Sequence, residues 1–153
     1  MSKSQVQTVC RDATKLAPFL VVKLNAALAE CISLGYVVAV FEGYRSPDRQ
    51  QWLYDQGRTR DGKIITNARP YESFHQYGLA VDIVGYYKKK WDWSIDYDKI
   101  TEVFKRHGFK PLKFEKAHFQ IDGGLTAKKA KQICKDQGLL ALWNIVETNL
   151  RLS

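Results

Sequence analysis

The sequence contains little cysteine, proline and glycine, and each shortage excludes a class of protein. Its three cysteines, Cys10, Cys31 and Cys134, are odd in number, widely spaced and without a CxxC pair. Neither a disulfide framework nor a zinc-thiolate cluster is therefore expected. The three cysteines are expected to be reduced thiols with a structural role. Four prolines and ten glycines exclude a collagen-like or low-complexity chain, and 45% hydrophobic residues exclude intrinsic disorder. These proportions predict a single compact domain over residues 1–153.

Long apolar runs are also lacking. No run reaches the roughly 20 residues that cross a bilayer, because Lys23 and Glu30 interrupt the most hydrophobic stretch, 16–34. Residues 1–14 contain no compact apolar segment followed by a small-residue cleavage site, so no secretory signal peptide is expected. The sequence thus predicts a protein that is made in a cytoplasm and does not insert into a membrane.

Negative charge is scarce relative to positive charge. Lys and Arg number 24 and Asp and Glu number 16, which gives a net charge of +8. Such a surface attracts an anionic partner, for example a cell-wall polymer, a nucleic acid or an anionic membrane. The charge alone does not choose among these partners.

Hydrophobic periodicity predicts helices interleaved with a few short strands. Helices are expected over 18–34, 47–56, 97–107, 126–136 and 139–150, and strands over 36–41, 79–84 and 118–121. The polar stretch 58–71 is expected to be a loop or a short hairpin, and loops of this length are often functional. This order of elements indicates an α+β fold with a small, mainly antiparallel central sheet flanked by helices.

Two of the three histidines lie among groups that bind metal or move protons. Asp82 lies in an apolar strand, where an ionised carboxylate needs a compensating charge such as a divalent cation. His75 precedes it by seven residues, and Gly78 allows the bend that would bring the two together. With His118 they would make three ligands and leave a fourth position for water, as in a catalytic zinc site. His107 ends a predicted helix and is assigned no chemistry.

Glu115 and Arg45 carry the charges that hydrolysis at such a site would need. Glu115 is placed to move protons as a general base, or else it is an exposed partner of Lys113 or Lys116. Arg45 lies at a strand-to-helix junction, where it would bind a substrate carboxylate or stabilise an oxyanion. Considered by itself, Arg45 is also typical of an ordinary surface arginine.

Taken together, these motifs resemble the zinc D-alanyl-D-alanine peptidase family. That family includes the vancomycin-resistance dipeptidases and carboxypeptidases and the phage L-alanyl-D-glutamate endolysins. The resemblance rests on Tyr44-Arg45-Ser46 with Gln50, on the SxHxxGxAxD element of 73–82 and on the ExxH element of 115–118. It covers residues 43–120 and implies a small α+β domain of the hedgehog and D,D-peptidase type.

The resemblance also implies a role for each motif residue. The implied ligands of a Zn²⁺ cofactor are His75, Asp82 and His118. Glu115 would be the general base and proton shuttle, and Arg45 would polarise the scissile carbonyl or anchor the substrate. Ser73 would hydrogen-bond the substrate. Gln50, the third residue of this substrate-binding set, would support the site from a position behind Arg45 and Ser73.

Within the family, the stretches 58–60 and 62–66 look most like the compact phage endolysins. The resemblance therefore implies a monomeric, bacteriolytic enzyme that cuts the L-alanyl-D-glutamate bond of peptidoglycan. It would be made in the host cytoplasm and would reach the cell wall after the membrane is permeabilised. One departure is that 109–114 replaces a stretch rich in tryptophan and glycine in many relatives, which predicts a different wall of the substrate pocket.

Two alternatives remain open. The first is a D,D- or L,D-carboxypeptidase of the same family. The second is a non-catalytic protein that binds cell wall or nucleic acid. In that protein Trp91 and Trp93, beside the lysines of 88–90, would stack on sugars or bases. Positions in the core or in a hairpin also account for these two tryptophans. The tail 124–153 lies outside the motifs, and its lysines form either a solvated helix face or a basic patch. The family resemblance favours a peptidoglycan substrate, with no nucleic-acid partner.

Overall fold

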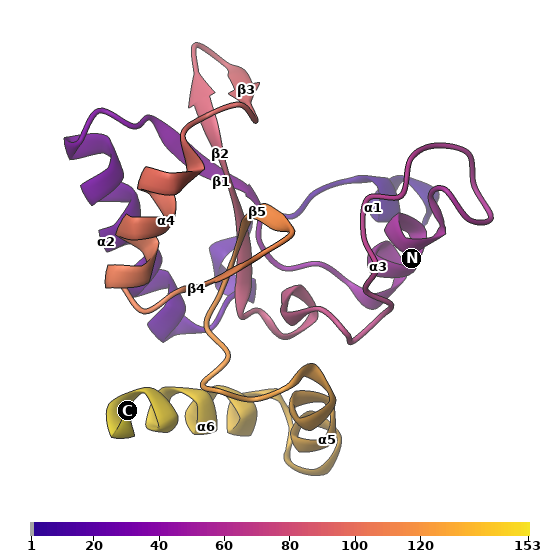
Figure 1. The fold of residues 1–153 in the computed structure, drawn as a ribbon. Helices are drawn as coiled ribbons and strands as arrows, with labels where there is room; N and C mark the ends of the chain where they lie inside the picture. Colours follow the sequence, from indigo (N-terminus) through magenta and orange to yellow (C-terminus); the bar gives the residue numbers. More distant parts are fainter. Residues whose placement is uncertain (1) are drawn as a thin grey trace.

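A five-stranded antiparallel sheet forms the centre of the computed structural model, which describes residues 2–153 (Figure 1). Its strands are β1 (Val38–Glu42), β2 (Ala80–Tyr87), β3 (Lys90–Asp92), β4 (Lys110–Leu112) and β5 (Glu115–Gln120). The strand order is β1-β2-β5-β4, and β3 pairs with the outer part of β2. This arrangement confirms the predicted α+β class.

Helices surround the sheet on several sides. They are α1 (Lys3–Gln7), α2 (Pro18–Ser33), α3 (Pro47–Asp55), α4 (Tyr97–Arg106), α5 (Ala127–Gln137) and α6 (Leu139–Leu152), with the 3₁₀ turns η1 (Ala13–Lys15) and η2 (Phe74–Tyr77). Figure 1 shows α2 and α4 on one side of the sheet, α1 and α3 on the other, and α5 and α6 across one end. Within residues 2–153, no helix is both long and apolar enough to cross a membrane.

Helix α2 forms where apolar residues recur every three or four positions. Leu20, Leu24 and Cys31 are buried on its inner face. Pro18 occupies the first turn, where backbone N–H groups have no partner within the helix, so its missing N–H costs no hydrogen bond. Ile32 continues the same recurrence in the sequence but is 56% exposed, so the buried face of α2 ends at Cys31.

The strands differ in length from the sequence-based prediction. β1 begins at Val38, two residues late, because the chain still closes α2 there: the Tyr36 N–H donates to the Cys31 carbonyl at 2.9 Å. β2 continues to Tyr87 because it turns back into β3 through Lys88 and Lys89, both at positive φ. Trp91 thus lies in a hairpin, as one of the interpretations proposed.

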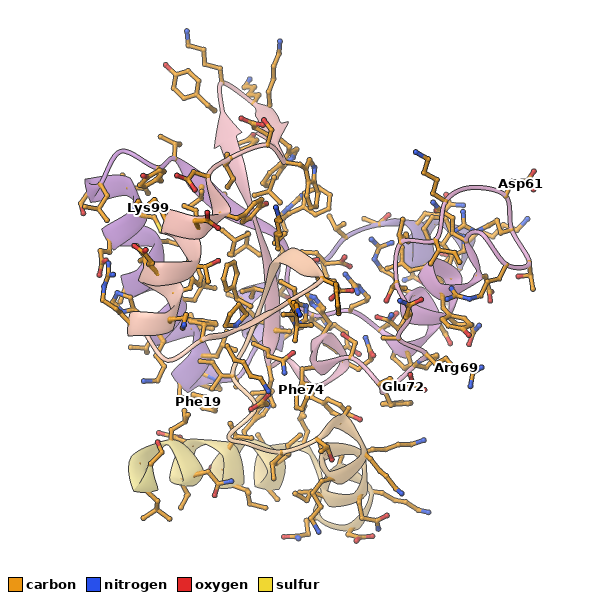
Figure 2. All side chains as sticks on the ribbon, viewed as in Figure 1. Phe19, Asp61, Arg69, Glu72, Phe74 and Lys99 are labelled. Carbon is orange, nitrogen blue, oxygen red and sulfur yellow. The ribbon has the colours of Figure 1, made fainter. Side chains whose placement is uncertain are left out.

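The long segment between α3 and η2 is a loop, and it contains no hairpin. It carries one isolated bridge, between Gln56 and Arg60. The guanidinium of Arg58 lies 3.7 Å from the centre of the Tyr54 ring and that of Arg60 lies 3.8 Å from Trp52, so both fasten the loop to α3. Figure 2 shows the labelled Asp61 at the outer tip of this loop.

The two C-terminal helices brace the segment that carries the first predicted ligand. Trp143 of α6 donates its indole N–H to the Tyr77 carbonyl at 2.7 Å. Thr126 caps α5 by accepting a hydrogen bond from the Lys129 N–H. The third histidine, His107, lies 3.0 Å from a Glu30 carboxylate oxygen of α2 and takes no part in the cluster described next.

Candidate metal site and active-site cleft

Three predicted ligands meet at one point inside the fold. Each of His75, Asp82 and His118 offers one ligand atom, and these atoms all lie within 4.8 Å of one another. His75 Nε2 is 3.3 Å and His118 Nδ1 is 3.8 Å from the same Asp82 oxygen, Oδ1. Ligand atoms about 2 Å from a tetrahedral zinc ion lie roughly 3.3 Å apart, so the donor types and their spacing fit a divalent ion.

The fold explains why side chains far apart in sequence converge here. Asp82 on β2 and His118 on β5 are directly opposite partners in an antiparallel pair, so their side chains share one face of the sheet. His75 arrives from η2, which Gly78 ends at φ 66°. A Cβ on Gly78 would lie 2.5 Å from the Lys15 carbonyl, so both the turn and the packing require glycine there.

The second nitrogen of each imidazole has a hydrogen-bond partner. His75 Nδ1 lies 2.7 Å from the Gly43 carbonyl, and His118 Nε2 lies 2.7 Å from Gln120 Oε1. A neutral imidazole donates from one nitrogen and keeps a lone pair on the other. Both lone pairs are then available on the nitrogens that approach Asp82, which is the arrangement that metal coordination requires.

Charge and burial act on the titratable groups of the cluster in different directions. Burial by itself would raise the pKa of Asp82, but neighbouring His75 and Arg45 hold that pKa well below its usual range. Burial and the adjacent His75 lower the pKa of His118 to about 4, so its imidazole is neutral near pH 7. A deprotonated carboxylate and a neutral imidazole are the forms that bind metal.

Glu115 lies at the start of β5, at the edge of the cluster. Its Oε2 is 3.8 Å from His118 Nδ1, and its side chain is partly open to solvent. Burial and the negative charge of Asp82 raise the pKa of the Glu115 carboxyl. Among residues 2–153, no ion pair joins Glu115 to Lys113 or Lys116, so the alternative of an exposed ion pair with these lysines is not realised.

Arg45 belongs to a network of mostly buried polar groups beneath the cluster. Its guanidinium donates to Glu42 at 2.8 Å, to Asp82 at 3.2 Å and to Gln50 at 3.0 Å. Arg49 donates to the same Glu42 through Nε at 2.5 Å. We name these five residues, Glu42, Arg45, Arg49, Gln50 and Asp82, the polar floor.

Two members of the polar floor, Glu42 and Arg49, are absent from the sequence-based site. Burial would raise the pKa of Glu42, but its hydrogen bonds and ion pairs with Arg49 and Arg45 lower it below the ordinary value. A possible signal in the sequence is the position of Glu42 at the end of an otherwise apolar strand, where a carboxylate requires a partner.

The cluster opens into a cavity of about 480 Å³. Three side chains from different segments line it and are exposed: Ile65 by 49%, Trp93 by 52% and Phe114 by 91%. We name these three the cavity rim. Ile65 comes from the long loop, Trp93 follows β3, and Phe114 lies in the turn between β4 and β5, in the stretch predicted to alter the pocket wall.

Ser73 and Gln50 lie near the cluster, and neither is among the cavity-lining residues of the described chain, 2–153. The Ser73 hydroxyl caps η2 by accepting from the His75 N–H at 3.3 Å. Gln50 is fully buried, accepts from Arg45 and donates to the Ala68 carbonyl. Gln50 thus contacts Arg45, and the roles expected of Gln50 and Ser73 in substrate binding stay predictions.

Solved structures with a similar fold include two peptidases. The crystal structure of the vancomycin-resistance D,D-pentapeptidase VanY from a VanB-type cassette, in complex with Zn(II), has a TM-score of 0.58 at 20% identity over 94% of this chain and 88% of that chain. The L,D-carboxypeptidase DacB from Streptococcus pneumonia has a TM-score of 0.55 at 21% identity over 84% of this chain and 76% of that chain. At these identities the likeness shows the fold alone.

Sequence comparison identifies the family, which the structural likeness alone does not. The peptidoglycan L-alanyl-D-glutamate endopeptidase CwlK of Bacillus subtilis (strain 168) is 36% identical over an alignment of 107 residues, and the match covers 62% of this chain and 64% of that protein. The match therefore spans less than two thirds of that relative's length. The family model described as VanY, D-alanyl-D-alanine carboxypeptidase, matches residues 14–123, a range that contains the cluster, the polar floor and the cavity rim. This match confirms the family resemblance: the chain belongs to the VanY family.

Proposed function

We propose that this protein is a zinc-dependent peptidase that hydrolyses the L-alanyl-D-glutamate bond of the peptidoglycan stem peptide. The observation that carries the proposal is the convergence of His75, Asp82 and His118 beside a cavity that also holds Glu115. The choice of bond is supported by the activity in the name of the CwlK relative. The net charge of +8 suits an anionic wall polymer.

The donor set fits zinc in kind and in number. Two neutral imidazoles and one carboxylate form a three-ligand set of the catalytic type, which leaves a position open. When bound, zinc supplies a Lewis acid that polarises a carbonyl and lowers the pKa of water. His75, Asp82 and His118 would hold the ion, and the hydrogen bonds from the ring nitrogens would keep both imidazoles in the required orientation.

Glu115 would handle the protons of the reaction. Its carboxylate lies in the cavity beside the cluster, and no Lys or Arg of residues 2–153 forms an ion pair with it. It would accept a proton from the attacking water and deliver a proton to the nitrogen of the leaving amine. One carboxylate can do both because the two transfers occur at different stages of hydrolysis.

Arg45 would supply positive charge next to the reacting carbonyl. It lines the cavity, and its side chain is 11% exposed there. Its positive charge would therefore act on a substrate carboxylate or on the oxyanion that develops during attack. Glu42, Gln50 and Asp82 hold the guanidinium in place, so little reorganisation is needed when substrate binds.

A carboxypeptidase is the second candidate function. It is favoured by the description of the matching family model and by the positive charge of Arg45 in the cavity, which suits a terminal carboxylate. The two functions differ in product: a carboxypeptidase releases single D-alanine, and the endopeptidase releases the stem peptide from D-glutamate onward and leaves L-alanine on the glycan. A role in phage lysis is a further expectation, which rests on the sequence resemblance.

Mass spectrometry of digested peptidoglycan tests the proposal. The purified protein, supplied with zinc, is incubated with isolated cell wall, and the released fragments and new termini are identified. We expect stem peptides that begin at D-glutamate, and we expect none from the Glu115→Gln variant. Release of D-alanine alone would move the assignment to carboxypeptidase. Salt-sensitive binding without any product would support the non-catalytic alternative and overturn the proposal.

A further inference from the structure

The two histidines of the cluster are held in different ways. The N–H of His75 is directed at a backbone carbonyl, that of Gly43, which side-chain substitution does not remove. The N–H of His118 is directed at the side chain of Gln120, two residues further along β5. Residues i and i+2 of a strand lie on the same face, which explains how Gln120 reaches the ring.

A glutamine side chain can present either its oxygen or its nitrogen to a neighbour. Gln120 has a second partner that decides this orientation: its Nε2 donates to Asp122 Oδ2 at 2.7 Å. A carboxylate only accepts hydrogen bonds, so the amide nitrogen must face Asp122. The amide oxygen then faces His118, where it accepts the Nε2–H at 2.7 Å.

Asp122 is itself fixed by two donors from outside β5. Its Oδ1 accepts the Gly124 N–H at 2.9 Å, and its Oδ2 lies 3.4 Å from Lys110 Nζ on the neighbouring strand β4. Both Gln120 and Asp122 are buried. Hydrogen bonds in such an environment are strong and leave few alternative arrangements.

We propose that Asp122 and Gln120 are positioning residues that fix the tautomer of His118. Asp122 orients the amide of Gln120, and Gln120 keeps the proton of His118 on Nε2 and the lone pair on Nδ1, directed into the cluster. The link to metal binding rests on the proposed function. The tautomer itself is a property of the metal-free protein and is measurable without any activity.

Disruption of this chain of hydrogen bonds should reduce metal affinity, because the lone pair would then be on Nδ1 for only part of the time. Residues that orient metal ligands typically change affinity by about 10- to 100-fold when they are replaced. The effect should be specific to His118, since His75 depends on the backbone of Gly43.

Three variants separate positioning from simple packing. Gln120→Leu removes the acceptor for His118. Asp122→Asn replaces one oxygen by nitrogen, so the side chain no longer has two acceptors for the Gly124 N–H and the Gln120 amide. The double variant Gln120→Glu with Asp122→Asn reverses the roles: the new carboxylate accepts from His118 and from the new amide, which restores the pattern.

The measurements are the nitrogen shifts of the His118 ring in metal-free protein near pH 7, and zinc affinity by competition with a chelator. We expect the wild type to carry the proton on Nε2. We expect Gln120→Leu and Asp122→Asn to populate the Nδ1–H form and to bind zinc roughly 10- to 100-fold more weakly. The double variant should recover the wild-type tautomer and most of the affinity.

A matched control is Gln132→Leu on α5, because Gln132 makes the same kind of hydrogen bond to Asp136 at an exposed position without a histidine. It should change neither measurement. A wild-type tautomer together with zinc affinity within about twofold in both Gln120→Leu and Asp122→Asn would overturn the proposal. Asp122→Asn is nearly isosteric and carries the test if Gln120→Leu does not fold. If the wild type binds no zinc, the proposed function fails, and the tautomer measurement still decides this inference.

Discussion

Four of the five polar-floor residues line the same cavity as the cavity rim, and the two regions differ in how firmly their side chains are held. In the floor, Glu42 pairs with both Arg45 and Arg49, and each of these side chains is mostly or fully buried. In the rim, Phe114 and Trp93 are more than half exposed. The difference indicates that the two regions have different roles: the polar floor fixes the reacting groups, and the cavity rim shapes the contact with substrate. Substitutions in the two regions should therefore affect different measured quantities.

The largest effect is expected at Glu115, which lies in the cavity between the two regions. Glu115→Gln removes the proton acceptor and leaves His75, Asp82 and His118 intact, so turnover should fall by roughly 10²- to 10⁴-fold while zinc content is unchanged. Steady-state hydrolysis of peptidoglycan and zinc quantification on the same preparation measure both. Full activity in this variant would remove Glu115 from the mechanism.

The next effect concerns stability and belongs to the floor. Glu42→Ala leaves Arg45 and Arg49 without their shared carboxylate, and loss of one partner from a buried ion pair costs about 3–5 kcal/mol of unfolding free energy. Glu102→Ala is the matched control, because Glu102 pairs with Lys99 on the surface of α4. That exposed pair should contribute no more than about 1 kcal/mol. Urea unfolding of both variants measures the difference, and equal losses would contradict the distinction between buried and exposed pairs.

Acid should weaken the floor in a defined pH range. The pKa of Glu42 in the folded protein lies below its ordinary value near 4.5, so the carboxylate contributes stability above that value and loses it as the pH falls through the lower, folded value. We expect the unfolding free energy of the metal-free protein to fall as the pH drops below about 5, and to fall less steeply in Glu42→Gln. Urea titrations at several pH values give both slopes. Parallel slopes for the two proteins would show that Glu42 does not carry this pH dependence.

The smallest effect on stability is expected in the rim. Phe114→Ala should change the unfolding free energy by no more than about 0.5 kcal/mol, because the ring makes little packing contact. If substrate covers the ring, KM should rise by roughly tenfold, which corresponds to about 1.4 kcal/mol of lost apolar contact. Tyr87→Ala, an exposed aromatic at the end of β2 outside the cavity lining, is the control and should leave KM unchanged. A loss of stability in Phe114→Ala with an unchanged KM would reverse the roles assigned to floor and rim.

The sequence predicted the cluster better than its surroundings. Spacing, the bend at Gly78 and the family resemblance were sufficient to predict that His75, Asp82 and His118 converge. Gln120 and Asp122 were not predicted as part of the site. Their role depends on hydrogen bonds along one face of β5, and a single sequence contains no sign of those bonds.

The elements were predicted unevenly, for a similar reason. Long helices such as α2 and α4 carry several turns of periodic apolar residues, and their ends fall close to the expected positions. β3 and β4 have three residues each, which is too short for any alternation to be visible. The tertiary packing of their neighbours, and not their own pattern, determines that they are strands.

The central claim is that His75, Asp82 and His118 share one zinc ion, and zinc titration of the metal-free protein tests it most directly. X-ray absorption at the zinc edge, recorded on the loaded wild type, counts the nitrogen and oxygen ligands. We expect one zinc per chain, a ligand shell with two imidazoles, and affinity at least about a hundredfold weaker in each of His75→Ala, Asp82→Ala and His118→Ala. Zinc binding of wild-type strength in any of these three variants would contradict the claim.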